Sequence, residues 1–393
     1  MKRKISILFF SSALLLTGCI PSLQRTEEEI IIVEEGDEVE EQQYVITPTI
    51  DTPENYYRSV LKDGKYQRSA ARGTVAHGMN NRIDIDQFEL GLMEIATATF
   101  SQDDYYFREG EILTGDEINR WLRRYDSSDD NNKDGLNPEL GKGDTLEEQM
   151  RKSPLVLSHI MEHNYIQGSE EDGVELGGIV IGLALRSVYY FRTEDDEGRY
   201  YNHEEELDLK EVEKQGKEIA QEVVERLRAK EELAGIPITV ALFQEEKRGA
   251  IVPGTFIALT HLSGDETKID SWEQVKEEYY FFPSRAAREA FPAQANAFSE
   301  FQNAVEEFFG RTVGIVGKGR YKNGNLEEMT IEFNLQSHGK AEIIALTQYV
   351  SGKLAPLTTD QAPTYVYINS INGPESIIVQ YPDHEPSIHV YKN

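Results

Sequence analysis

The sequence predicts an α+β protein, with mixed helices and mainly antiparallel sheets in two packed subdomains. Segments with apolar residues at helical spacing and segments rich in Val, Ile and Tyr both occur, and the two kinds neither alternate strictly nor separate into halves. A chain of 393 residues is also longer than one typical hydrophobic core supports. A boundary near 285–295 divides the folded part into a larger α+β domain, 54–290, and a C-terminal α+β subdomain, 291–393.

The predicted helices follow apolar periodicity and cap signals. Thr114 stands at the N-cap of one helix, and Glu117 follows at the spacing of a capping box. The longest predicted helix, 205–235, has one solvated face and closes at Gly235. Helices are predicted over 82–100, 114–125, 205–235, 294–309 and 340–353.

The predicted strands are short apolar runs between turn residues. GGIVIGLALRSVYYFR (177–192) is rich in Val, Ile, Leu and Tyr and is interrupted by glycine, which favours one or two buried strands. Other strands are predicted over 236–244, 254–262, 312–321 and 326–335, and near 364–371, 375–381 and 386–391.

The charge balance is strongly acidic, with 40 basic against 70 acidic side chains and a formal net charge of −30. Such a surface repels nucleic-acid phosphates and anionic lipid headgroups, so the sequence argues against a nucleic-acid partner. The single cysteine excludes an intramolecular disulfide and any thiolate metal cluster.

The first 18 residues have the form of a secretory signal peptide. Lys2, Arg3 and Lys4 make a basic start, and the apolar run Ile5–Leu16 is too short to span a bilayer as a helix. Leu16-Thr17-Gly18-Cys19 then resembles the cleavage site of bacterial lipoproteins, with cleavage between Gly18 and Cys19.

Cys19, the only cysteine of the chain, stands where lipoprotein chemistry requires a thiol. We therefore expect a diacylglyceryl group on Cys19, processing by the signal peptidase for lipoproteins, and a location on the extracytoplasmic face of the cell membrane. Two acyl chains anchor a protein stably where one chain binds only marginally. An ordinary signal peptide with an incidental cysteine is the alternative.

Residues 19–53 are predicted to be an acidic tether. Nine acidic side chains lie between Glu27 and Glu41, and blocks of like charge favour extended, solvated chain. The stretch from Ile20 to Pro53 reaches roughly 110 Å at full extension. The alternative is an edge strand, because Ile30–Val33 is apolar.

The loop Asp130–Glu139 invites a calcium interpretation. Asp130, Asn132, Asp134 and Gly135 match positions one, three, five and six of an EF-hand loop. Gly141 stands where the bidentate glutamate should be, however, and turn-forming loops have this composition for conformational reasons alone.

His159-Ile-Met-Glu162-His163 fits the H-x-x-E-H pattern of inverted zincins. On a helix the two imidazoles would share one side and Glu162 would serve as general base, which gives a surface zinc-dependent hydrolase as an alternative function. No third ligand is evident, and two half-exposed histidines in a helix or strand are the favoured explanation of the pattern. We assign no catalytic, cofactor-binding or metal residue from sequence and expect no enzyme.

Two further stretches have ordinary structural explanations. GIVGKGR (314–320) lacks the spacing of a phosphate-binding loop and favours a closely packed strand. EEYYFFP (277–283) favours core packing over a groove for a ligand. A solute-binding lipoprotein is a third possible class, although no motif identifies a ligand.

Several motifs together resemble one family over nearly the whole chain after the tether. The pattern resembles the CamS family of sex pheromone lipoproteins of low-GC Gram-positive bacteria. The motifs are NRIDIDQFELGL (81–92), KDGLNP (133–138), SPLVLSHIMEHNY (153–165), GGIVIGLALRSVYYF (177–191), FFPSR (281–285), GKGRYKNGNL (317–326) and LTQYV (346–350).

The resemblance implies a function for the part of the chain that is cut away. In this family the last seven or so residues of the signal peptide are released as a hydrophobic peptide that induces conjugative plasmid transfer. Here that peptide is SALLLTG, Ser12 to Gly18. It differs from the active peptide of the family, which is richer in Ile and Phe near its start. The resemblance assigns no catalytic residue, so we expect the mature domain to be a surface binding module.

Overall fold

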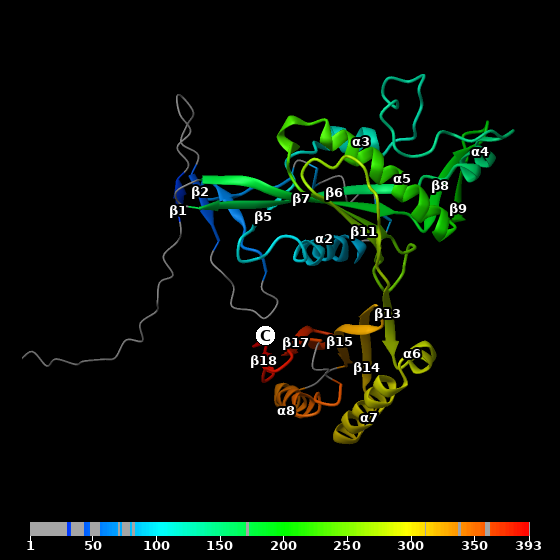
Figure 1. The fold of residues 1–393 in the computed structure, drawn as a ribbon. Helices are drawn as coiled ribbons and strands as arrows, with labels where there is room; N and C mark the ends of the chain where they lie inside the picture. Colours follow the sequence, from blue (N-terminus) through cyan, green and yellow to red (C-terminus); the bar gives the residue numbers. More distant parts are fainter. Residues whose placement is uncertain are drawn as a thin grey trace, which may run out of the picture.

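The computed structural model describes residues 30–32, 43–47, 56–69, 71–72, 79–80, 83–169, 173–310, 312–336, 339–357 and 362–392 (Figure 1). The predicted signal peptide, Gly18 and Cys19 lie outside these residues. Two six-stranded sheets dominate the described chain, and helices cover both. The α+β prediction is confirmed.

The first sheet has the strand order β12-β11-β10-β7-β6-β5. All neighbours are antiparallel except β7 and β10, which run parallel and are joined through a long helix. The last eight residues of β7 are all buried, as expected for a strand covered on both faces. The strands are β5 (Tyr106–Glu109), β6 (Leu157–Ser169), β7 (Gly173–Leu185), β10 (Ile238–Gln244), β11 (Thr255–Leu262) and β12 (Glu273–Gln274).

Helices cover the two faces of this sheet. On one face lie α3 (Gly115–Trp121) and α5 (Leu209–Arg228), and on the other lies α2 (Ile83–Ala96) (Figure 1). The sheet sits between two apolar cores, one that includes α3 and α5 and one that includes α2. We call this sheet and its helices the first lobe.

Helix α2 approaches the sheet closely because β7 carries a glycine beneath it. A Cβ atom at Gly182 would lie 2.5 Å from Cζ of Phe88 and 2.7 Å from Cδ1 of Leu92, far inside van der Waals contact. Phe88 and Leu92 are both fully buried. The glycine of this strand is therefore a packing requirement.

Smaller elements surround the first lobe. The hairpin β8 (Val188–Glu194) and β9 (Tyr200–Glu206) packs near α4 (Leu146–Lys152), and a 3₁₀ turn, η1 (Glu231–Leu233), follows α5. A four-stranded sheet has the order β1-β2-β3-β4. Its strands are β1 (Ile30–Ile32), β2 (Gln43–Ile46), β3 (Val60–Lys62) and β4 (Lys65–Tyr66).

The tether prediction differs from the structure in part. Two of its segments form β1 and β2, and β2 pairs with β3 of the folded chain. Ile46 is buried together with Val60, Tyr106 and Ile166, so a small apolar cluster outweighs the solvation of this end of the acidic stretch. The other residues of 19–53 lie outside the described chain, apart from Thr47.

The second sheet has the strand order β13-β14-β15-β16-β17-β18. Its β15 and β16 are parallel and are connected through α8, while the other pairs are antiparallel. The strands are β13 (Glu277–Phe282), β14 (Gly314–Lys322), β15 (Asn325–Leu335), β16 (Thr364–Ser370), β17 (Gly373–Gln380) and β18 (Ser387–Val390).

Three helices accompany the second sheet: α6 (Arg285–Ala290), α7 (Pro292–Phe309) and α8 (Lys340–Ser351). In the view of Figure 1, α7 and α8 lie below the sheet and α6 lies to its right. We call this sheet and its helices the second lobe. Its core includes Phe298 and Phe301 of α7 and Leu346 of α8. Because β13 pairs with β14, residues 277–282 already belong to the later sheet. The predicted division at residues 290 and 291 stays a prediction.

The longest predicted helix is shorter than expected. Residues 205 and 206 are in strand β9, and α5 begins after the N-cap Asp208, whose carboxylate accepts hydrogen bonds from two backbone N–H groups. The helix ends at Arg228 with Ala229 as its C-cap, so Gly235 does not close it. The capping box of Thr114 and Glu117 is confirmed.

Candidate functional site

The H-x-x-E-H residues lie on strand β6, so the helical premise of a zinc site is wrong. Residues four apart on a strand are separated by roughly 13 Å, whereas two imidazoles that share a zinc ion bring their nitrogens within roughly 4 Å. His159 and His163 therefore do not form a pair of ligands. Within the described residues, no group of three or more His, Cys, Asp or Glu side chains is arranged to hold a metal ion.

Both histidines are deeply buried, so the expectation of half-exposed side chains is wrong. His159 and His163 are each 2% exposed, and the Nδ1 atom of each has no hydrogen-bond partner among the described residues. Burial lowers the pKa of His159 to about 4 and that of His163 to about 3. His163 packs edge-on against the ring of Phe107, with ring centroids 5.0 Å apart. The two imidazoles are therefore neutral at physiological pH.

Glu162 has a structural function between them. Its carboxylate accepts hydrogen bonds from the backbone N–H groups of Glu111, Ile112 and Leu113, at 3.1, 3.0 and 2.7 Å. Burial raises the pKa of Glu162 although these N–H groups favour the charged form. Because β5 ends at Glu109, the bonds fasten the chain that follows to the free edge of β6. A carboxylate used in this way is not a free general base.

A cavity of about 280 Å³ lies at this edge of β6. His159 and His163 contribute to its wall together with the apolar side chains of Leu113, Ile118 and Ile160. Asp86 and Glu89 of α2 and the ion pair of Arg72 with Glu109 line it as well. The residues come from four separate stretches of chain, and only His159, Glu162 and His163 stood out in the sequence.

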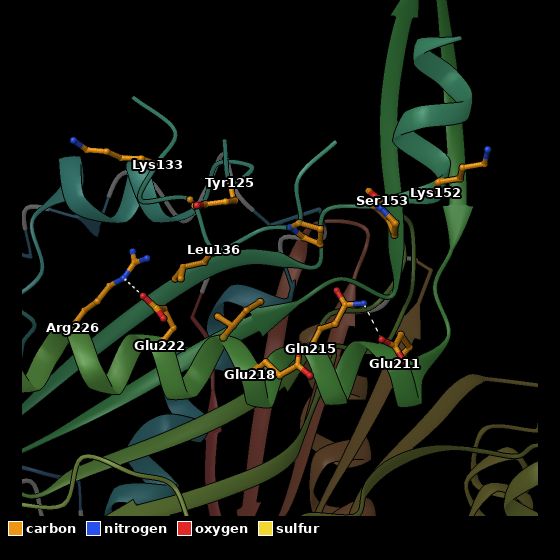
Figure 2. Close-up of a pocket in the computed structure, with 14 residues that line it drawn as sticks. Tyr125, Lys133, Leu136, Lys152, Ser153, Glu211, Gln215, Glu218, Glu222 and Arg226 are labelled. Carbon is orange, nitrogen blue, oxygen red and sulfur yellow. Dashed lines mark hydrogen bonds and ion pairs between the residues drawn. The ribbon is translucent and has the colours of Figure 1, made fainter. Parts of the chain in front are cut away.

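A wider groove of about 680 Å³ lies between α5 and the loops that cross its outer face (Figure 2). Glu211, Gln215, Glu218 and Glu222 project from α5 along one side. The opposite side includes Tyr125, Lys133, Leu136, Lys152 and Ser153.

Most charged side chains of this groove are in ion pairs, one of them within the groove and the others with neighbours outside it. Arg226 Nε lies 3.0 Å from Glu222 Oε1, and Arg226 Nη1 donates to the backbone oxygen of Asp134 at 2.7 Å. Lys152 pairs with Glu148 at 2.6 Å. The groove is thus a charged, open surface, and it holds no nucleophile with an adjacent base among the described side chains.

The loop Asp130–Glu139, considered above for calcium, directs its oxygens to different neighbours. Asp130 is 97% exposed and pairs with Lys133, and Asp134 pairs with Arg120 at 3.6 Å. The side chain of Asn132 donates to Asp129. The carboxylates do not converge, so turn formation accounts for this segment.

Two buried carboxylates were missed by the sequence reasoning. Asp84 is fully buried and accepts from the backbone N–H groups of Glu246 and Gly254, and its burial raises its pKa to about 6. Glu245 accepts from Ser158 and from the N–H of Asn80, and burial raises its pKa to about 7.

These carboxylates hold loops at the carboxyl end of the parallel pair β7 and β10. The sequence contains so many acidic residues that these two did not stand out. The position of Glu245 directly after a buried apolar strand was the available signal.

The two other sequence candidates are structural elements. Residues 314–320 are part of β14, where a Cβ atom at Gly317 would lie 2.5 Å from the ring of Phe298. Residues 277–282 are β13, and its Phe282 is fully buried. Within the described residues, no helix has the length and apolar character needed to cross a membrane.

Comparison with known proteins identifies relatives of the whole folded part. The family described as CamS sex pheromone cAM373 precursor matches residues 66–386. A sex pheromone precursor from Lactobacillus salivarius subsp. salivarius is similar in structure, with a TM-score of 0.77 and 26% identity over 89% of this chain and 99% of its own.

The C-terminal domain of the sex pheromone staph-cAM373 precursor from Staphylococcus aureus is also similar. Its TM-score is 0.68, with 29% identity over 80% of this chain and 99% of its own. No curated protein matches the sequence.

Proposed function

Because this chain belongs to the CamS family of sex pheromone cAM373 precursors, we propose that it is a lipid-anchored surface lipoprotein whose cleaved signal peptide is the source of a short peptide signal. The family match over residues 66–386 carries this proposal. The proposal has three parts: an anchor at Cys19, a released peptide from residues 12–18, and a folded domain that binds a ligand outside the cell.

The anchor is supported by the sequence around the cysteine. Leu16, Thr17 and Gly18 precede Cys19, and small residues directly before the thiol suit a signal peptidase for lipoproteins. A diacylglyceryl group buries two acyl chains at about 0.8 kcal/mol per methylene, which holds the mature chain on the extracytoplasmic face of the membrane.

The released peptide is supported by its chemistry. SALLLTG has no charged side chain, and three consecutive leucines give it an apolar centre. Such a peptide partitions out of the membrane after trimming and enters an apolar receptor pocket. A pocket of that kind distinguishes single methylenes by about 1–3 kcal/mol, so the leucines define which receptor responds.

For the folded domain we propose ligand binding and no catalytic step. The structure gives no support to the zinc hydrolase alternative, because the H-x-x-E-H residues are spread along a strand and Glu162 is occupied by backbone N–H groups. The cavity beside the two histidines supports a binding role for this domain.

The anchor is tested by fractionation of cells that produce the chain or its Cys19→Ser variant in a Gram-positive host. The wild-type chain is expected in the membrane fraction and to incorporate labelled fatty acid. Cys19→Ser is expected to incorporate none and to lose cleavage after Gly18, whereas the neighbouring control Ile20→Val behaves as wild type. Equal fatty-acid labelling of Cys19→Ser and the wild type would contradict the assignment of Cys19.

A further inference from the structure

The cavity at the free edge of β6 has the size of a site for a small molecule. Its volume of about 280 Å³ lies just below the range typical of pockets for drug-sized ligands. It corresponds to the liquid volume of about nine water molecules. An occupant of this cavity is therefore a small molecule of a few non-hydrogen atoms, far below the size of a heptapeptide.

The inner wall combines apolar surface with two buried polar groups that lack partners. His159 and His163 are each 98% removed from solvent, and the Nδ1 atom of each has no hydrogen-bond partner among the described residues. More than nine in ten buried polar groups find a partner in folded proteins, so two orphans on one cavity wall are unusual. Both imidazoles are neutral at physiological pH, so neither carries a positive charge that would repel a cation in the cavity.

The charges around the cavity leave a surplus of carboxylate. Glu109 is satisfied, because it accepts hydrogen bonds from Tyr66, the backbone N–H of Ser69 and Arg72. Glu162 is satisfied by the three backbone N–H groups described above.

Asp86 and Glu89, three residues apart on one face of α2, are different. Within the described chain neither makes an ion pair, although both line the cavity. Burial raises the pKa of Glu89, and the charges of Glu109 and Asp86 add to this effect against that of Arg72. A cation at this position would relieve the repulsion between these carboxylates.

We propose that this cavity binds a small organic ammonium ion, with its charged head between Asp86 and Glu89 and its apolar body against Met161 and Ile160, beside the two imidazoles. The inference names the ligand class of the binding domain proposed above and rests on that part of the proposal. It is independent of the release of residues 12–18, which is measured in the culture medium, so the two fail separately.

The test uses three probes that share one apolar body and differ in the head group: 3-methylbutylamine, 3-methylbutanol and 4-methylpentanoate. The full-length chain, labelled with ¹⁵N-histidine and solubilised in dodecylmaltoside, is titrated with each probe at pH 7.5 and low salt. Imidazole ring signals are followed by NMR. His203, His261 and His384 lie outside the cavity and serve as internal references.

The amine is expected to shift the ring signals of His159 and His163 in a saturable way, at concentrations at least tenfold below those needed of the alcohol. Glu89→Gln is expected to weaken the amine at least fivefold, and Asp86→Asn, on an exposed side chain, provides a second variant that preserves the fold. Glu218→Gln on the exposed face of α5 makes the same charge change elsewhere and is expected to stay within twofold of wild type.

Three results would overturn the proposal. Equal or tighter binding of the alcohol or the carboxylate would show that the site does not select a cation. The absence of any shift at His159 and His163 at saturating amine would show that the cavity is not the site. Equal effects of Glu89→Gln and Glu218→Gln would reduce the binding to general attraction by an acidic protein.

Discussion

Arg320 connects the two lobes and offers a sharp test of how they are held together. Its Nη1 atom lies 2.9 Å from Glu94 of α2 and 3.0 Å from Glu277 of β13. Glu277 is 3% exposed and also accepts from the backbone N–H of Phe256 in β11. Burial raises the pKa of Glu277 in spite of the charge of Arg320. Glu277 is therefore a buried carboxylate that depends on its arginine.

Replacement by methionine, Arg320→Met, keeps the aliphatic stem and removes the charge. Breaking a buried ion pair lowers the free energy of unfolding by about 3–5 kcal/mol. Because the backbone N–H of Phe256 still donates to Glu277, we expect a loss near 3 kcal/mol here. Glu94→Gln should cost about 1 kcal/mol or less, because Glu94 is 38% exposed and Arg320 retains Glu277. Arg320→Met/Glu277→Gln should recover at least 1 kcal/mol, since no charge is then left buried without a partner.

The loss should also depend on pH. Without Arg320 the pKa of Glu277 rises further above its unfolded value, so the folded state of the variant binds a proton that the unfolded state does not. The stability of the variant is then highest below the unfolded pKa and falls as the pH rises through the folded pKa. Urea unfolding at pH 5 and pH 8 measures both effects. A loss below 1 kcal/mol at pH 8, or a double variant no more stable than Arg320→Met, would refute this reasoning.

Three further predictions concern the first lobe. Asn137→Ala should cost about 3 kcal/mol in urea unfolding, because the buried amide bonds four backbone groups of Leu122, Val156 and Leu157, while a change below 1 kcal/mol would contradict this role. Gly182→Ala should cost about 1–3 kcal/mol through the clash with Phe88, and a thermal midpoint equal to wild type would show that α2 adjusts freely. For His163→Gln, the loss of unfolding free energy relative to wild type should be about 2 kcal/mol smaller at pH 5 than at pH 7. The folded pKa of His163, about 3, lies below the unfolded value, so the stability of the wild type falls as the pH drops below about 6.5, and the variant lacks this effect. An equal difference at both pH values would argue against a neutral buried imidazole.

Local signals in the sequence predicted the elements that local interactions determine. The capping box of Thr114 and Glu117 begins α3 as predicted, and the strands predicted at 312–321 and 326–335 correspond to β14 and β15. These elements depend on neighbouring residues, which a sequence displays directly.

Elements that depend on distant partners were harder to predict. The glutamates of residues 204–206 favour a helix by propensity, yet their pairing with β8 makes them strand β9. The sequence of β6 shows no clear strand pattern, because His159, Glu162 and His163 interrupt its apolar residues. They are buried because β6 lies inside a sheet with covered faces, which only the tertiary structure supplies.

The candidate cavity could be predicted only in part for the same reason. The sequence singled out His159, Glu162 and His163, although for a zinc site on a helix. Arg72, Asp86 and Glu89 reach the same cavity from stretches about 70 to 90 residues earlier, and no local pattern relates them to the histidines. Contacts of this separation follow from strand order and helix placement.

Mass spectrometry of the culture medium tests the central claim most directly. Cells that produce the chain with isotopically labelled leucine should release SALLLTG, whose three labelled leucines, Leu14, Leu15 and Leu16, give a defined mass shift. Synthetic SALLLTG should induce conjugation in plasmid-bearing responder cells, and Cys19→Ser should abolish the released peptide. A medium that contains the intact signal peptide or no fragment ending at Gly18, with the mature chain present on the cells, would contradict the proposal that this precursor supplies a peptide signal.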